Sequence, residues 1–273
     1  MKGNLHIHTT NSDGTKTVSE INQLAQQFGF DLVAITDHDT VEAIDEINAL
    51  NTPIQFMIGV EMSCKYAGED IHILGYFGNH ITEEVRVYFK KVSAERILRC
   101  QKIIKNLKDY YNIEISYEDV KKKADGVIAR PHIAQTICEK YGCTFDEAFD
   151  KYIGNKAKAY VPYEVIGLED AINFLKEHQA LVILAHPIWI KKFDFHDILD
   201  FGFDGIEVYH PDQSKEYSQA LKALAEEKDL LITGGSDYHG DITNNRFEQS
   251  YIEGKTLETF LTRLNQKQKT LTK

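Results

Sequence analysis

The chain has 273 residues, of which 42% are hydrophobic, and it carries a formal net charge of -11. This length and composition suit one large globular domain, or one domain with an insertion, and exclude an intrinsically disordered chain. The negative charge argues against a protein that grips nucleic acid through an extended basic face. Bound divalent cations would reverse the local sign, so a phosphate could still bind at a metal cluster.

The cysteines and the apolar runs indicate in which cellular compartment we expect the protein. No two cysteines form a Cys-x-x-Cys pair, so we do not expect a thiolate zinc site. The first residues contain no apolar stretch of the signal-peptide type, and no run approaches the ~18 apolar residues that span a bilayer. We therefore expect a cytoplasmic protein with free thiols and no membrane segment. The oligomeric state is left open.

Short apolar runs separated by amphipathic segments predict the fold. Several runs are nearly continuous in Val, Ile and Leu, which is typical of parallel strands buried on both faces. Helical periodicity fills segments 17–29, 168–179 and 215–228. We predict an α/β fold with a closed or nearly closed barrel of the TIM type, and an open doubly wound sheet is the alternative. The predicted strands cover residues 4–8, 32–36, 54–60, 71–77, 181–185, 205–209 and 230–235.

One connection is much longer than a barrel crossover needs. The segment between the fourth and fifth predicted strands has helical periodicity at 83–110 and again at 131–141, where Pro131 suits the first turn. We predict a helical insertion at 79–165, with residues 1–78 and 166–273 forming the barrel.

The first motif with metal-binding potential is His6-Ile7-His8. Residues two apart on a strand point to the same face, so both imidazoles can reach one ion. Asp13, in the following NSDGT turn, offers an oxygen ligand, although an Asp-Gly turn explains it equally well.

Polar residues also follow or interrupt the next predicted strands. His38 lies in a TDHDT motif after the second strand, where the aspartates could instead cap a helix. Glu61 ends the third strand, and its two carboxylate oxygens can bridge two ions. His72 lies inside the fourth strand, where a lone histidine is more often a core residue.

The same pattern continues in the second half of the chain. His186 and His210 follow the fifth and sixth strands, and Asp237-Tyr238-His239 follows the last strand with the two-residue spacing of the first motif. Arg130 and His132 belong to the insertion, and Arg130 could hold a phosphate through paired hydrogen bonds.

The joint placement of these residues is more informative than any single motif. The carboxyl ends of barrel strands converge on one mouth, which is where active sites form. Histidine and carboxylate ligands without thiolate suit zinc, manganese or iron, and their number suggests two or three divalent ions.

The motifs HIHTTNSDGT, ITDHDT, GVEMS, IHILGYF, ARPHIA, LAHP and GSDYHG resemble, in this order, those of the PHP (polymerase and histidinol phosphatase) family. The insertion with ARPHIA resembles the branch of nucleoside 3′,5′-bisphosphate phosphatases and RNase AM-like 5′-to-3′ exoribonucleases. The resemblance implies a distorted (βα)7 barrel that holds up to three ions. The implied ligand sets are His6, His8, Glu61 and Asp237; Glu61, His72 and His132; and Asp13, His38 and His239.

The predicted activity is hydrolysis of a phosphate ester by a metal-bound hydroxide. Arg130 and His186 would contact the phosphate, with His186 as the proton donor and His210 as a further substrate contact. The expected substrate is a nucleoside 3′,5′-bisphosphate or the 5′ end of a short RNA. A phosphatase of small metabolites such as histidinol phosphate is the first alternative, and a non-catalytic module that binds metal or nucleotide is the second. Amide or ester hydrolysis is a third.

Overall fold

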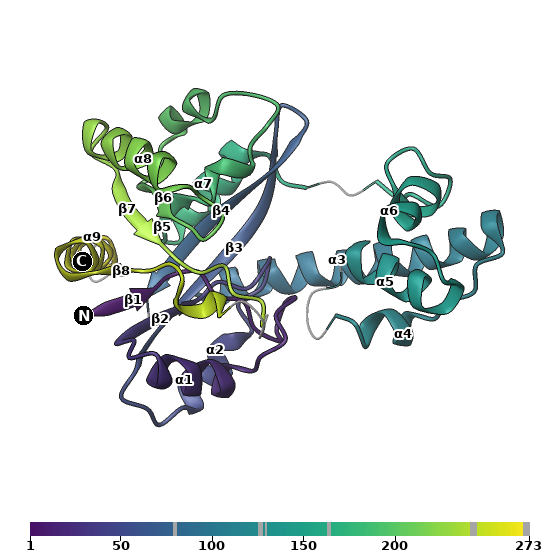
Figure 1. Cartoon of the computed structure of the whole chain (residues 1–273), viewed down its shortest axis with the longest axis horizontal. Helices are drawn as coiled ribbons and strands as arrows, with labels where there is room; N and C mark the ends of the chain where they lie inside the picture. The colour runs from purple at the N-terminus through teal and green to yellow at the C-terminus, as the bar shows by residue number, and fades with distance from the viewer. Residues whose placement is uncertain (79–80, 125–127, 129, 163–164, 241–244, 270–273) are drawn as a thin grey trace.

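The computed structural model describes residues 1–78, 81–124, 128, 130–162, 165–240 and 245–269. It places a strand-and-helix barrel at one side and a group of helices at the other, joined by one long helix that runs between them (Figure 1). In the part of the chain that is described, no helix is both long and apolar enough to cross a membrane.

The barrel wall is a single mixed sheet of eight strands in the order β7-β6-β5-β4-β3-β2-β1-β8. A strand occurs at or beside each of the seven predicted positions, but β1 ends at Asn4, so His6 and His8 follow this strand and do not lie on it as predicted. β8 was not predicted because two residues give no detectable pattern. The strands are β1 (Lys2–Asn4), β2 (Leu32–Ile35), β3 (Gln55–Tyr66), β4 (Glu69–Gly78), β5 (Leu181–Leu184), β6 (Gly205–Tyr209), β7 (Leu231–Gly234) and β8 (Ile252–Glu253).

The direction of β4 is where the barrel departs from a regular (βα) repeat. β4 runs antiparallel to both β3 and β5, whereas β1–β2–β3 and β5–β6–β7 are parallel runs. The reason is the short connection between β3 and β4, in which Ala67 and Gly68 both have positive φ. A two-residue hairpin leaves no room for a crossover helix.

Backbone contacts between the two ends of the chain close the wall. The N–H of Leu5 donates to the carbonyl of Gly234 at 3.2 Å, and the N–H of His8 donates to the carbonyl of Tyr238 at 2.9 Å. Gly235 permits this approach, since a Cβ there would lie 2.3 Å from the backbone nitrogen of His6. The first and last motifs of the sequence are therefore neighbours.

Helices cover the outside of the barrel, and the predicted segments 17–29, 168–179 and 215–228 are confirmed as helical. Thr17 caps the first of them in a reciprocal pair with Glu20. The helices are α1 (Val18–Gln27), α2 (Ala43–Ala49), α7 (Leu168–Glu177), α8 (Lys215–Glu227) and α9 (Gly254–Gln268), with short 3₁₀ turns η2 (Pro187–Trp189), η3 (Phe195–Phe201) and η4 (Arg246–Glu248).

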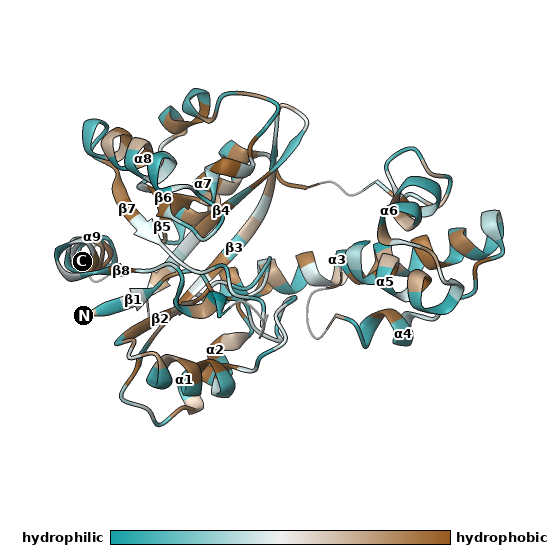
Figure 2. Ribbon diagram, viewed as in Figure 1, coloured by the Kyte–Doolittle hydropathy of each residue, from teal (hydrophilic) through white to brown (hydrophobic). Residues whose placement is uncertain are grey.

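Much of the ribbon of the strands is coloured as hydrophobic in Figure 2. Apolar side chains of the strands pack inside the barrel, and α9 closes one end of it. Leu257, Phe260 and Leu264 of α9 pack in one cluster with Leu5 and Leu181. Gln268 near the end of α9 donates a hydrogen bond to the carbonyl of Phe77, and Lys267 pairs with Asp204 just before β6. The candidate metal-binding histidines and carboxylates lie at the opposite end of the barrel.

The insertion is helical, as predicted. Its elements are α3 (Glu83–Tyr111), α4 (Tyr117–Lys121), α5 (Arg130–Tyr141), α6 (Phe145–Ala148) and the π-helical turn η1 (Phe149–Ile153). The 29-residue helix α3 takes part in two separate cores. Val85 and Phe89 pack with the barrel, while Cys100, Ile103 and Leu107 pack with α4, α5 and η1.

Candidate metal centre

Glu61 lies at the centre of the site, on β3, with 1% of its surface exposed. Its backbone N–H donates to the carbonyls of Thr36 and Asp37, at 3.1 Å each, and its own carbonyl accepts from Asp39 at 2.9 Å. The pairing of β3 with the residues that follow β2 therefore fixes the position of the carboxylate.

Five imidazoles surround the Glu61 carboxylate. Oε1 faces Nδ1 of His72 and Nε2 of His186, both at 2.8 Å. Oε2 lies 3.1–3.2 Å from three more ring nitrogens, which are Nε2 of His6, Nε2 of His8 and Nδ1 of His38. One carboxylate thus lies among side chains from four other segments of the chain, since His6 and His8 share one segment.

The barrel brings these side chains to one mouth. Glu61 lies within β3 and not at its end as predicted, because β3 continues to Tyr66. Glu61 and His72 lie on the β3–β4 hairpin, where Ser63 pairs with His72. The other residues follow the parallel strands: His6 and His8 after β1, His38 after β2, His186 after β5, His210 after β6, and Asp237 and His239 after β7.

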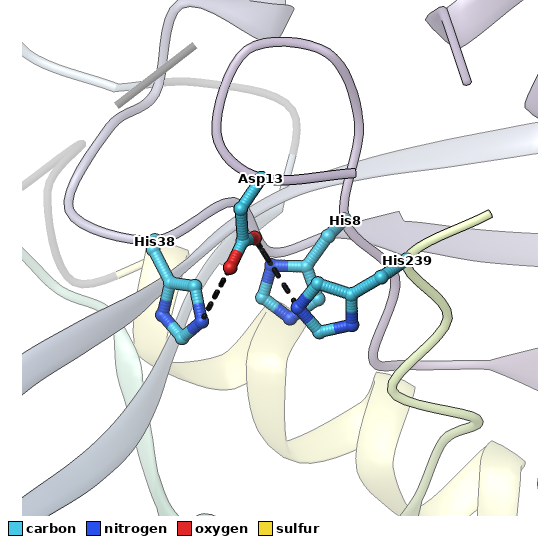
Figure 3. Close-up of side chains that lie close together, drawn as sticks. All are labelled: His8, Asp13, His38 and His239. Atoms are coloured by element: carbon cyan, nitrogen blue, oxygen red, sulfur yellow. Dashed lines mark ion pairs between the residues drawn. The ribbon is translucent and has the colours of Figure 1, made fainter. Parts of the chain in front are cut away.

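A second group lies beside the first and is drawn in Figure 3, where the rings of His8, His38 and His239 point toward Asp13. Oδ1 of Asp13 is 3.2 Å from Nε2 of His239 and 3.6 Å from Nδ1 of His8, and Oδ2 is 3.7 Å from Nε2 of His38. The NSDGT turn that carries Asp13 therefore folds over the cluster.

Asp237 connects the cluster to His210. Its Oδ1 lies 3.4 Å from Nε2 of His6 and 3.1 Å from Nε2 of His8, while its Oδ2 lies 3.3 Å from Nε2 of His210. His210 is thereby placed at the edge of the cluster, where the guanidinium of Arg246 is also 3.7 Å from Asp237.

Glu207 is a site residue that the sequence reading missed. It lies in β6 with 0% of its surface exposed, and its Oε1 is 3.0 Å from Nδ1 of His6. Its Oε2 accepts a hydrogen bond from the backbone N–H of His186 at 2.8 Å. An ionisable residue inside the apolar GIEVY run was the available signal. By holding Nδ1 of His6, Glu207 directs the other ring nitrogen toward Glu61.

The electrostatics of the centre are those of ionised carboxylates among imidazoles. Burial alone would raise the pKa of Glu61, but the nearby histidines hold it well below its usual range. The same competition lowers the pKa of Asp237 far below normal. Burial dominates at His38 and lowers its pKa to about 4, so this imidazole is neutral at pH 7. Neutral imidazoles and ionised carboxylates are the forms that bind metal.

The donor atoms fit divalent ions. Among the described residues, Nε2 of His8 and Nδ1 of His38 are buried without a hydrogen-bond partner, although carboxylate oxygens lie close by. Buried ring nitrogens normally find partners, so these atoms are directed at a position that an ion can fill. Within the part of the chain that the structure describes, three donor groups form, each with atoms within 4.8 Å of one another: His6, His8, Glu61 and Asp237; His8, Asp13, His38 and His239; and His38, Glu61 and His72.

In the described ranges of the chain, the group of His6, His8, Glu61 and Asp237 is the same as one implied ligand set. The group around Asp13 contains His8 in addition to the implied residues, and the group of Glu61 and His72 contains His38 where the resemblance implies His132. Among the described residues, none of the three groups includes His132. The side chain lies in the first turn of α5, is 6% exposed, and belongs to the insertion and not to a strand end. The ligand role of His132 therefore stays a prediction.

A cavity of about 380 Å³ lies between the metal centre and the insertion. His38, His72 and Asp13 form one wall, and three arginines line it as well: Arg96, Arg99 and Arg130. The guanidinium of Arg130 lies 5.5 Å from the ring of Tyr160, and that of Arg99 lies 5.7 Å from the same ring. Only Arg130 was singled out from the sequence, since α3 carries many charges and nothing distinguishes Arg96 and Arg99 among them.

The motif resemblance is confirmed by comparison with known proteins. The sequence is 32% identical over 271 residues to a 5′-3′ exoribonuclease of Haemophilus influenzae, with 94% of each chain covered. It is 27% identical over 250 residues to a 3′,5′-nucleoside bisphosphate phosphatase of Chromobacterium violaceum, with 86% of each chain covered.

A solved structure gives the same result for the fold. A protein of Bifidobacterium adolescentis, described as a candidate metal-dependent phosphoesterase, superposes with a TM-score of 0.76 at 27% identity over 96% of each chain. The predicted TIM-like barrel is thus confirmed. The pattern of the PHP domain matches residues 4–269, and the chain belongs to the PHP domain family.

Proposed function

We propose that this chain is a metal-dependent hydrolase of phosphate esters, and that its substrate is a nucleoside 3′,5′-bisphosphate or the 5′ end of a short RNA. The observation that carries the proposal is the Glu61 carboxylate, with five imidazoles within 3.2 Å. The names of the relatives, an exoribonuclease and a bisphosphate phosphatase, support the substrate class.

The three donor groups would hold two or three divalent ions, of manganese, iron or zinc. When bound, such ions supply Lewis acidity to a phosphoryl group and lower the pKa of water toward neutrality. Glu61 belongs to two of the groups and has an oxygen toward each side, so it is the residue placed to bridge them.

The protein's own side chains orient the substrate. Arg99 and Arg130 line the cavity next to His38 and His72, and guanidinium groups pair with phosphate oxygens through parallel hydrogen bonds. They would draw an anionic substrate into a protein whose net charge is -11. His186 is our candidate for the proton donor to the leaving oxygen, since Glu207 fixes its backbone and its ring reaches Glu61.

The test is the Asp237→Ala variant with metal present. Asp237 contacts both His6 and His8, so its loss should reduce kcat/KM by at least about 100-fold, as expected when a metal-linked catalytic group is lost. Asp200→Ala, which removes a carboxylate that is 86% exposed, is the matched control and should keep wild-type activity. Full activity of Asp237→Ala would overturn the assignment.

A substrate panel separates the alternatives. Adenosine 3′,5′-bisphosphate and a 5′-phosphorylated trinucleotide should be hydrolysed with higher kcat/KM than histidinol phosphate, and inorganic phosphate should inhibit. Preference for histidinol phosphate would support a small-metabolite phosphatase. Fewer than two tightly bound ions per chain, together with no hydrolysis, would support a non-catalytic module.

A further inference from the structure

We propose that Trp189 is the platform on which the base of the nucleotide substrate stacks. This inference rests on the proposed function and adds a recognition element to it. Trp189 is the single tryptophan of the chain, and 57% of it is exposed. A half-exposed tryptophan leaves a large aromatic face available to a ligand.

Trp189 lies next to the metal centre. Its ring centroid is 5.7 Å from that of His186 and 6.4 Å from that of His210. His186 in turn reaches Oε1 of Glu61 at 2.8 Å. One imidazole therefore separates the indole from the centre, a separation comparable with the sugar that joins a phosphate to its base.

The loop that carries Trp189 is held in place. The N–H of Trp189 donates to the carbonyl of His186 at 3.0 Å. Farther along, the Glu69 carboxylate accepts from the N–H groups of Lys191 and Lys192, at 2.9 and 2.8 Å. Ile190 packs against the barrel core. Because hydrogen bonds hold the loop on both sides of the indole, little conformational entropy is lost when a ligand binds.

These contacts favour a base over other occupants. Aromatic side chains beside phosphate sites bind bases by stacking, and stacking tolerates any base because each has a π face. The bound base would extend the substrate away from the arginine-lined cavity, which lies on the side of His38 and His72.

The single tryptophan makes the test direct. Rapid mixing of the metal-loaded protein with adenosine 3′,5′-bisphosphate should quench tryptophan fluorescence before the first turnover, and the quench should saturate. Ribose 3,5-bisphosphate, which has no base, should leave the emission unchanged. If both ligands bind and neither quenches, the stacking proposal is wrong.

Variants give an independent measurement. Trp189→Ala should raise KM for adenosine 3′,5′-bisphosphate about 5- to 140-fold, which corresponds to about 1–3 kcal/mol per stacked base, while KM for the base-free ligand stays at the wild-type value. Trp189→Phe should restore most of the loss. Tyr110→Ala removes an equally exposed aromatic, at 57%, from the insertion end of α3 and should behave as wild type with both ligands.

The outcomes also distinguish this proposal from the proposed function. Hydrolysis with the same rise in KM for both ligands in Trp189→Ala would overturn stacking and leave the phosphoesterase assignment intact. Base-dependent quenching in a protein that hydrolyses neither ligand would support stacking and overturn the assignment.

Discussion

The pair formed by Glu207 and His6 shows how single side chains organise the centre. Glu207 is fully buried, and it contacts the ring of His6 and the backbone of His186 with different oxygens. A carboxylate behind a ligating histidine fixes which ring nitrogen faces the ion and raises the basicity of the imidazole. Glu207 therefore belongs to the centre together with the candidate ligands that it positions.

Replacing Glu207 by Gln should weaken metal binding by about 10- to 100-fold, because the amide cannot fix the His6 ring as an ionised carboxylate does. Competition with a chromophoric chelator measures this affinity. Glu226→Gln changes a glutamate that is 63% exposed and should leave the affinity unchanged. Equal affinities in all three proteins would contradict the role given to Glu207.

Metal binding should be linked to pH through His8. Burial by itself would lower the pKa of His8, but Asp237, Glu61 and Asp13 raise it to about 10 in the metal-free protein. At pH 7 the ring is then protonated, and an ion must displace that proton. We expect the affinity to rise with pH and binding to release protons. Calorimetry in buffers of different ionisation enthalpy measures the number of protons released on metal binding. A release of zero protons would contradict the protonated state assigned to His8.

Most of the candidate site residues could be named from the sequence because most of these histidines and carboxylates stand at or next to the end of an apolar run. Glu207 and Trp189 could not. Glu207 resembles the outward residue of an alternating strand, and only the closed barrel turns that position inward. Trp189 lies in a short turn after His186, and its exposure depends on how the Glu69 contacts hold that turn.

At the scale of elements, α3 is joined to the barrel through Arg96. Its guanidinium pairs with Asp39, which is 3% exposed, and also contacts Oγ of Ser63 at 3.3 Å. Asp39 follows His38 directly and accepts from the N–H of Ser63 at 2.8 Å. The ion pair therefore ties the insertion helix to the segment that carries a candidate ligand.

Arg96→Ala should lower the free energy of unfolding by about 3 kcal/mol, because a buried carboxylate is left without its cation. Urea denaturation measures the change. Arg86→Ala, on the same helix, removes a guanidinium whose partner Asp45 is 71% exposed and should cost less than about 1 kcal/mol. Equal losses in the two variants would show that the Arg96 pair is no stronger than a surface contact.

The elements themselves were largely predictable, and their directions were not. Apolar runs and helical periodicity located seven strands and the long helices within a few residues. The antiparallel direction of β4 depends on the Ala67-Gly68 turn. It could not be predicted because a run of apolar residues does not indicate whether the strand is parallel or antiparallel to its neighbours. The partner of β1 at the sheet edge, β8, becomes a strand only through that pairing.

For the whole molecule, the two hydrophobic cores of α3 predict two units of stability. The first half of the helix packs with the barrel and the second half with α4, α5 and η1. Native-state hydrogen exchange should therefore show residues 100–107 opening together with α5, and residues 85–89 opening with the barrel. A single opening free energy along the whole of α3 would contradict the division of this helix between two cores.

The closure of the barrel by its first and last segments has a consequence for the stability of the folded chain. The four cysteines are free, so no disulfide restrains it. Ions shared by His6 or His8 and Asp237 would join residues at opposite ends of the sequence and close a loop of about 230 residues. Because these ligand atoms meet only in the folded chain, the binding free energy of the ions would add to the stability of the fold, and a chelator should lower the Tm. The ions that we propose for catalysis would then also hold the two ends of the folded chain together.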